Sequence, residues 1–152
     1  LVLMRPPAVD ALYHRFQNTL FDEAIAMLVE NENVRIVLLP RNDSQRAMYS
    51  TKRNVIVPRA PLPGPDLIAA SDLVISAGGT INREAAALGV PAASIYAGRW
   101  AAVDEQLVKE GRLLRISDTA DLRGLVVQKK QAMQPRRSAA VIDEILEFIL
   151  ES

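Results

Sequence analysis

Short apolar segments alternate with helical patterns along the chain, and this alternation limits the possible folds more than any other feature of the sequence. Most of the apolar segments contain consecutive apolar residues, as strands do when helices cover both faces of a parallel sheet. The sequence therefore predicts an α/β fold with a Rossmann-like, doubly wound sheet of six parallel strands. The predicted strands cover residues 1–4, 34–39, 54–57, 72–76, 91–96 and 113–116.

The segments between these strands have helical spacing. Between the first two strands, apolar residues recur at every fourth position from Phe16 to Leu28, with polar side chains on the opposite face. The terminal helix has an apolar face that packs either on this domain or on a domain outside the chain. The other helices are predicted at residues 43–50, 65–70, 82–88, 103–110 and 119–131, with the terminal helix at 137–150.

Length and composition exclude several classes of function. A chain of 152 residues forms one ordinary domain.

Its 18 basic residues balance 18 acidic ones, so the net charge does not favour nucleic acid as a partner. The chain has no cysteine, and His14 is its only histidine, so we expect neither a metal site nor a cofactor. No apolar stretch has the length of a membrane span, and no signal peptide is recognisable. We therefore expect a cytoplasmic protein.

A glycine-rich loop follows the fourth predicted strand. Residues 76–80 read Ser-Ala-Gly-Gly-Thr and lead directly into a predicted helix. Glycines at such a junction let backbone N–H groups approach a ligand, and a helix N-terminus favours negative charge. One interpretation is that Ser76, Gly78, Gly79 and Thr80 bind a phosphate or diphosphate. The other is a tight strand-to-helix turn without a ligand.

The helix after this loop contains one acidic candidate. Glu84 lies about one turn from the helix start, where a carboxylate can accept hydrogen bonds from the vicinal hydroxyls of a ribose. A favourable acidic residue near a helix N-terminus is the alternative. The helix is expected to end at Gly89 in the left-handed conformation, because Pro91 cannot continue it.

The segment at residues 72–91 also resembles a known family. It reads DLVISAGGTINREAAALGVP and is similar to the signature of the domain-of-unknown-function family 354, whose members are similar to UDP-N-acetylglucosamine 2-epimerases and other GT-B proteins. The chain has one residue more between the second glycine and Glu84 than the epimerases have, which rotates Glu84 around its helix. Further similar segments, in the family's order, are 5–7 with Tyr13, 39–41 with Gln45, 103–107 and 110–113.

The resemblance implies a domain organisation and a set of ligand contacts. Residues 1–152 correspond to a C-terminal nucleotide-sugar-binding domain of GT-B type, and the N-terminal domain is absent from the chain. Gly78, Gly79 and Thr80 are implied to bind the nucleotide diphosphate, with Glu84 as the ribose candidate. Arg83 either assists a phosphate or faces water.

Three more residues follow predicted strands or begin a helix. Arg5 and Arg41 follow the first two strands. By the resemblance Arg5 contacts phosphate or the sugar, and Arg41, with Gln45 nearby, contacts the nucleotide base or phosphate. The alternative for both is a solvated surface arginine. The carboxyl ends of the first, second and fourth strands meet at the crevice of such a sheet, so we expect Arg5, Arg41 and Gly78 to lie close together. Asp104 either caps its helix or recognises the sugar.

The implied function is binding of a nucleotide-diphosphate sugar, in particular a UDP-sugar, in a glycosyltransferase or a sugar 2-epimerase. The catalytic residues are expected largely in the absent domain, so the chain alone is expected to bind nucleotide without turnover. The alternative is a non-catalytic Rossmann-like module for binding or assembly. A flavin or dinucleotide domain is disfavoured, because no G-x-G-x-x-G follows the first strand.

Overall fold

The computed structural model describes residues 1–8, 19–131 and 139–150 of the chain. In this part of the chain, six strands form one sheet in the order β3-β2-β1-β4-β5-β6, and every pairing is parallel. This is the strand order of the Rossmann fold, so the predicted sheet is confirmed. The strands are β1 (Val2–Arg5), β2 (Ile36–Leu38), β3 (Val55–Ile56), β4 (Leu73–Ser76), β5 (Ala92–Ser94) and β6 (Leu114–Arg115).

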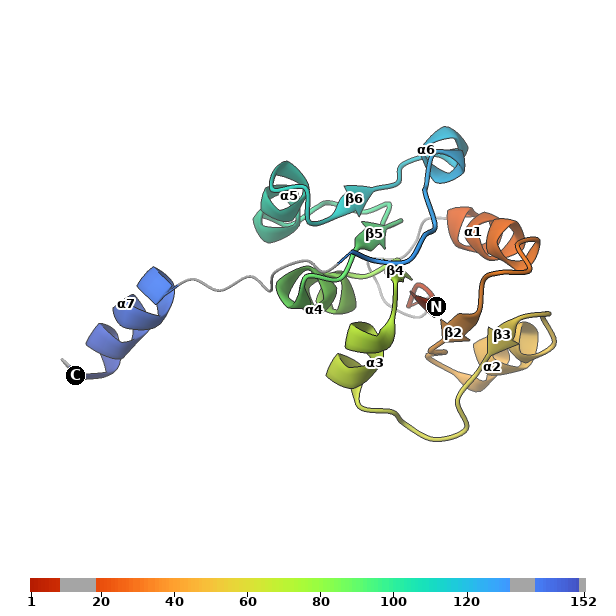
Figure 1. Cartoon of the computed structure of the whole chain (residues 1–152), viewed down its shortest axis with the longest axis horizontal. Coiled ribbons are helices and arrows are strands. Elements are labelled where there is room, and N and C mark those ends of the chain that lie inside the picture. The colour runs from red at the N-terminus through yellow and green to blue at the C-terminus, as the bar shows by residue number, and fades with distance from the viewer. Residues whose placement is uncertain (9–18, 132–138, 151–152) are drawn as a thin grey trace.

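Helices connect each strand to the next and lie on both sides of the sheet (Figure 1). The first helix begins at Leu20, and Phe16, with which the predicted helical pattern starts, lies outside the described part of the chain, as do Tyr13 and His14. The helices are α1 (Leu20–Val29), α2 (Asp43–Ser50), α3 (Gly64–Ala70), α4 (Gly79–Leu88), α5 (Ala102–Lys109), α6 (Thr119–Arg123) and α7 (Ala139–Leu150).

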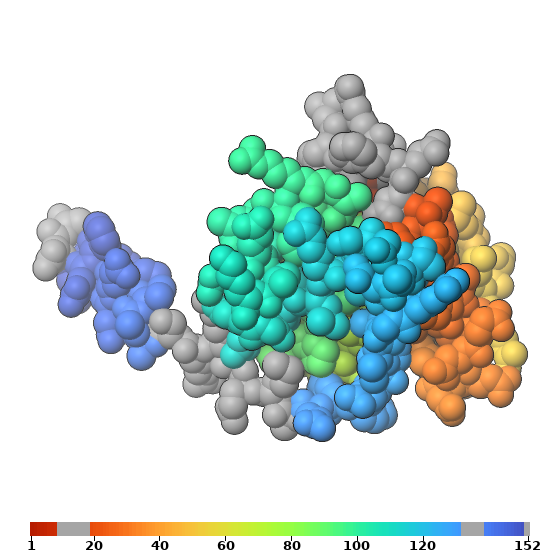
Figure 2. All heavy atoms as spheres, turned by 90° about the horizontal axis from the view of Figure 1, so that it is seen from above, coloured from red at the N-terminus to blue at the C-terminus, as the bar shows by residue number. Residues whose placement is uncertain are grey.

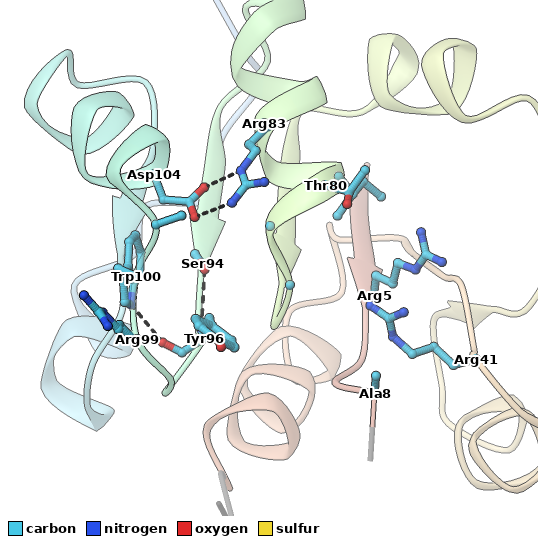
Figure 3. Close-up of a pocket in the computed structure, with 14 residues that line it drawn as sticks. Arg5, Ala8, Arg41, Thr80, Arg83, Ser94, Tyr96, Arg99, Trp100 and Asp104 are labelled. Carbon is cyan, nitrogen blue, oxygen red and sulfur yellow. Dashed lines mark hydrogen bonds and ion pairs between the residues drawn. The ribbon is translucent and has the colours of Figure 1, made fainter. Parts of the chain in front are cut away.

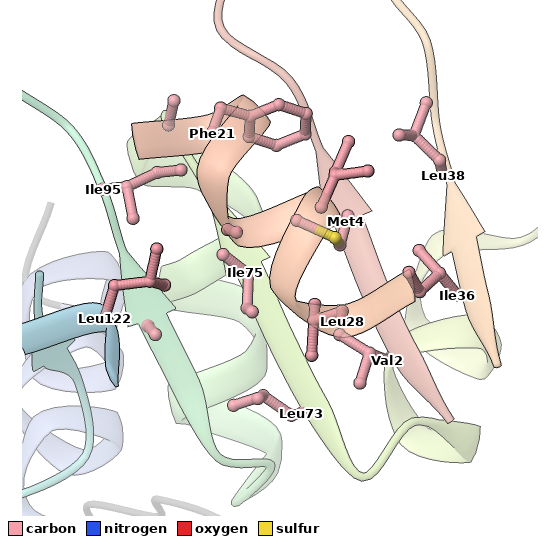
Figure 4. Packing of buried hydrophobic residues seen from close by; sticks show 14 of the residues in the cluster. Val2, Met4, Phe21, Leu28, Ile36, Leu38, Leu73, Ile75, Ile95 and Leu122 are labelled. Carbon is pink, nitrogen blue, oxygen red and sulfur yellow. The ribbon is translucent and has the colours of Figure 1, made fainter. Parts of the chain in front are cut away.

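Two apolar clusters hold the layers together, because successive residues of a strand point to opposite faces of a sheet. Val2 and Met4 of β1 are fully buried on one face, where they pack with Phe21 of α1 and with α6 (Figure 4). Leu3, also fully buried, belongs to the cluster on the other face. That second cluster includes Ile68 of α3, Ala85 of α4 and Leu107 of α5.

The junction between β4 and α4 is short. α4 begins at Gly79, before the predicted start at residue 82, so the second glycine of the loop lies in the first helical turn. The helix ends at Gly89, whose φ of 72° lies in the left-handed region and whose N–H donates to carbonyls at the end of the helix. The predicted conformation of Gly89 is thereby confirmed.

The helix predicted at residues 119–131 is wrong over most of its length, because α6 ends at Arg123. Leu125 and Val127 then pack against the cluster beneath α1 and α6. Their spacing of two residues places both side chains on one side of an extended chain. Figure 2 shows this segment, in light blue, lying on the body of the domain. Burial of these two residues therefore outweighs the helical spacing of the sequence.

α7 lies apart from the sheet (Figure 1), and none of its residues is buried. The predicted terminal helix is confirmed from Ala139 onward, while residues 137 and 138 lie outside the described part. Its apolar side chains are open to solvent, with Phe148 76% exposed. The described residues of this domain therefore do not cover the apolar face of α7.

Candidate functional site

Side-chain hydrogen bonds from both ends fix the backbone of the loop between β4 and α4. Ser76 is fully buried, and its hydroxyl accepts from the N–H of Gly78 (3.1 Å) and donates to the carbonyl of Gly78 (2.8 Å). Asn82 donates to the same carbonyl from its Nδ2 (3.0 Å). Among the described residues, no side chain caps the N-terminus of α4. The first N–H groups of the helix are therefore available to an anionic ligand.

These N–H groups border a cleft of about 440 Å³ at the carboxyl edge of the sheet. The side chains around it come from loops and helix starts that are distant in sequence, as Figure 3 shows. Lining it are Arg5, Ala8, Arg41, Gly78, Gly79, Thr80, Ile81, Arg83, Ser94, Tyr96, Arg99, Trp100, Ala101 and Asp104. The expectation that Arg5, Arg41 and Gly78 lie together is therefore met by the fold.

Two arginines bring positive charge to one side of the glycine loop (Figure 3). Arg5 ends β1, and among the described residues its buried Nε has no hydrogen-bond acceptor. Arg41 donates from Nε to the carbonyl of Pro6 (2.8 Å), and its backbone N–H donates to Oε1 of Gln45 (2.8 Å). The bond to Pro6 joins the loops after β1 and β2 and holds the guanidinium of Arg41 at the cleft.

A carboxylate and a third arginine lie on the other side of the loop. Arg83 donates from Nε and Nη2 to the two carboxylate oxygens of Asp104, each at 2.8 Å. The hydrogen bonds to Asp104 raise the pKa of Arg83 above its ordinary value, so its guanidinium stays charged. Asp104 does not cap α5, whose N-cap residue is Ala101. The capping interpretation of Asp104 is thus wrong, and Asp104 is 8% exposed at the cleft.

Two predicted site residues lie elsewhere. Ser76 is buried beneath the loop and organises its backbone, but it does not line the cleft. Glu84 is exposed and is not among the lining residues, whereas its neighbour Arg83 is. The ribose contact at Glu84 stays a prediction.

Sequence reasoning did not single out the aromatic side of the cleft. Trp100 donates from its ring nitrogen to the carbonyl of Tyr96 (3.1 Å), and the guanidinium carbon of Arg115 lies 4.4 Å from the centroid of the Trp100 ring. Both aromatic residues lie in the loop after β5, where no repeating spacing marks them. Ser94 ends β5 as Ser76 ends β4, but the predicted strand ran to residue 96, so its position at a strand end was not predicted.

The register of the sheet explains how these groups come together. One row across the carboxyl edge consists of Arg5, Ser76, Ser94 and Arg115, and the preceding row consists of Met4, Ile75, Ala93 and Leu114. The polar residues therefore end their strands at the same level. The row behind them is apolar.

Within the described residues, no group of three or more His, Cys, Asp or Glu side chains is arranged to hold a metal ion. None of the helices in this part of the chain has the length and apolar character needed to cross a membrane.

Fold and cleft together define a Rossmann-like α/β domain. Its arginine-rich cleft lies at the start of a helix that begins with two glycines. The chain belongs to the protein family of unknown function DUF354, which it matches over residues 1–152. The family resemblance of residues 72–91 is thereby confirmed. An uncharacterised protein of Methanocaldococcus jannaschii is 31% identical over 121 residues, which are 80% of this chain and 35% of that relative. The chain thus spans about a third of the length of this relative.

Solved structures with the same fold include UDP-GlcNAc 2-epimerases and a rhamnosyltransferase. The UDP-GlcNAc 2-epimerase of M. jannaschii, in complex with UDP-GlcNAc and UDP, has a TM-score of 0.65 at 15% identity over 99% of this chain and 45% of that one. The Neisseria meningitidis UDP-GlcNAc 2-epimerase bound to UDP-GlcNAc has a TM-score of 0.55 at 19% identity, over 98% of this chain and 35% of that one. The spinosyn rhamnosyltransferase complexed with spinosyn aglycone has a TM-score of 0.60 at 20% identity, over 80% of this chain and 32% of that one. At these identities the likeness establishes the fold alone, whose neighbours are GT-B proteins.

Proposed function

We propose that the chain binds the diphosphate of a nucleotide sugar, in particular a UDP-sugar, at the start of α4. One observation carries the proposal: two consecutive glycines, at a helix N-terminus that no described side chain caps, border a cleft that also contains Arg5 and Arg41. Backbone N–H groups at a helix start favour anions, and arginines add charge-assisted hydrogen bonds to phosphate oxygens. The fold shared with an epimerase that was solved with UDP-GlcNAc and UDP supports the nucleotide-sugar class.

The same cleft supports a role for this chain as one half of a larger enzyme. Among the described lining residues, Asp104 is the one carboxylate, and its two oxygens accept from Arg83. A general acid or base needs a free carboxylate, imidazole or comparable group near the reacting atoms. We therefore assign catalysis largely to an N-terminal domain outside this chain, in a glycosyltransferase or a sugar 2-epimerase, and expect this chain alone to bind without turnover.

The engagement of Asp104 also favours a second candidate, a non-catalytic module that binds nucleotide or assembles with a partner. The two candidates differ in the full-length protein. An enzyme turns over a UDP-sugar there, by transfer or by epimerisation, and a non-catalytic module binds UDP without consuming any nucleotide sugar.

Calorimetric titration of the chain with UDP, UMP, ADP and GDP tests the proposal. UDP is expected to bind most tightly, and Gly79→Asp is expected to abolish binding because it places a carboxylate at the phosphate position. Gly64→Asp is the matched control, since Gly64 also begins a helix and a β-carbon there meets nothing within 4 Å. Glu84→Ala in the same titration tests the ribose contact. Absence of UDP binding in a folded sample contradicts the proposal for this chain.

We also propose a cytoplasmic location, because the chain contains no cysteine and so has no disulfide that would need an oxidising compartment. Fractionation of cells with an antibody against the chain tests this. Recovery in a secreted or surface fraction contradicts it.

A further inference from the structure

Arg83 and Asp104 form a fixed unit beside the start of α4. Both hydrogen bonds are 2.8 Å long, and the planar fork of a guanidinium matches a carboxylate in this two-point arrangement. The Asp104 side chain is 11% exposed and the Arg83 side chain 40% exposed. The carboxylate is therefore the buried anchor of the pair, and the guanidinium is the part that reaches the open cleft.

The guanidinium of Arg83 covers the second glycine of the loop. A β-carbon on Gly79 would lie 2.8 Å from Nη2 and 2.9 Å from Cζ of Arg83, too close for any real β-carbon. On the other side, a β-carbon on Gly78 would lie 3.3 Å from Nη2 of Arg41. Figure 3 shows Arg83 and Asp104 on one side of the start of α4, with Arg5 and Arg41 on the other.

Two guanidinium groups thus lie over two consecutive residues, whose α-carbons are about 3.8 Å apart. Because the two groups lie on opposite sides of the start of α4, each can contact a different phosphate of a linked pair. A guanidinium carries five N–H donors, and Asp104 accepts from two of those of Arg83. Among the described residues, the other three donors of Arg83 have no acceptor.

We propose that Asp104 is a positioning residue that holds Arg83 over Gly79, so that Arg83 contacts the second phosphate and makes the site prefer diphosphates to monophosphates. This inference rests on the proposed function, since it concerns the same cleft. The opposite role, in which Asp104 competes with the ligand for Arg83, is incompatible with this proposal.

The test compares Asp104→Asn and Arg83→Gln with wild-type protein in titrations with UDP, UMP, inorganic pyrophosphate and inorganic phosphate. Both variants are expected to weaken UDP and pyrophosphate about 10- to 100-fold, with little change for UMP and phosphate. Asp66→Asn and Arg53→Gln are matched controls, because Asp66 is an exposed acid in the first turn of α3 and Arg53 pairs with Glu32 on the surface.

Several outcomes overturn the inference. Tighter or unchanged UDP binding by Asp104→Asn shows that the carboxylate competes or has no role. Equal losses of UDP and UMP in Arg83→Gln show that Arg83 does not distinguish the second phosphate. If Asp104→Asn does not fold, Arg83→Lys decides, because it keeps the charge without the two-point contact and is expected to reduce the ratio of UDP to UMP affinity.

The inorganic probes separate this inference from the proposed function. If pyrophosphate binds with the expected dependence on Arg83 and UDP binds no better than pyrophosphate, the inference stands and the nucleotide assignment fails. If wild-type protein binds neither UDP nor pyrophosphate, both fail.

Discussion

The hydroxyl of Tyr49 in α2 donates a hydrogen bond of 2.8 Å to Oδ1 of Asp22 in α1, and its ring meets Phe21 edge-on at 5.9 Å. Tyr49 is 5% exposed, so this contact joins two helices across the buried cluster. Tyr49→Phe keeps the ring contacts and removes the hydrogen bond. We expect the free energy of unfolding in urea to fall by about 1 kcal/mol. An unchanged value would show that the bond contributes nothing.

Alkaline pH should weaken the fold through the same residue. Burial, followed by the hydrogen bond to Asp22, raises the pKa of Tyr49 above its ordinary value. The unfolded chain releases this proton near pH 10, whereas the folded chain retains it, so the free energy of unfolding falls as the pH rises above about 10. Urea titrations between about pH 8 and pH 11 should show a smaller fall for Tyr49→Phe. Equal falls in both proteins would contradict this.

Acidic pH should weaken the contact between α1 and α6. The hydroxyl of Thr119 donates to Glu23 (2.7 Å) and that of Thr19 also does (2.8 Å), and these bonds lower the pKa of Glu23. Their stabilisation is present above the ordinary glutamate pKa and is lost as the pH falls through the lowered pKa of the folded state.

Melting temperatures at about pH 7 and about pH 3 test this for Glu23. Thr119→Val removes the principal donor, so its melting temperature should fall less between the two pH values than that of wild type. Thr51→Val is the control, because the Thr51 hydroxyl donates to the carbonyl of Met48 in its own helical turn and, among the described residues, to no carboxylate. A fall in Thr119→Val equal to that of wild type would refute the prediction.

Gly79→Ala should disturb binding without unwinding α4. The added methyl group would meet the Arg83 guanidinium at 2.8 Å, while the backbone conformation of Gly79 suits other residues. We expect displacement of Arg83 from Asp104 and a loss of UDP affinity of about tenfold, with unchanged circular dichroism. Gly78→Ala is the comparison, and it should lose less, because the closest atom there lies 3.3 Å away. The reverse order of losses would contradict the geometry.

The central strand β4 should be far more sensitive to truncation than the edge strand β3. Ile75 is fully buried, so Ile75→Ala should lower the free energy of unfolding by about 2–5 kcal/mol. Ile56 in β3 is 54% exposed, and Ile56→Ala should change it by less than about 1 kcal/mol. Urea unfolding of the two variants gives both values, and similar losses would contradict the layer assignment.

The strands were the most predictable part of the fold, because burial on both faces leaves uninterrupted apolar residues in the sequence. The helix predicted at residues 119–131 shows where that reasoning ends. Leu122, Leu125 and Val126 have helical spacing, yet Val126 is 70% exposed and Leu125 packs against the core from outside any helix. Spacing alone cannot show which apolar residues the rest of the domain will cover.

The site was predictable where a strand end fixes the position of a residue, as for Arg5 and Arg41. It was less predictable on α4, where each residue points about 100° away from the one before it. Arg83 therefore lines the cleft while its neighbour Glu84 is exposed. Tyr96 and Trp100 gave no signal, because their contact forms within an irregular loop.

The polar row at the carboxyl edge of the sheet has a consequence for how this domain can diversify. Ser94, which lines the cleft, and Arg115 lie one step beyond Ala93 and Leu114 in the register. Exchanges confined to that outermost level leave the apolar levels of the sheet untouched. A few substitutions at this one level can therefore change which ligand the domain prefers, while the apolar residues that stabilise the sheet stay the same.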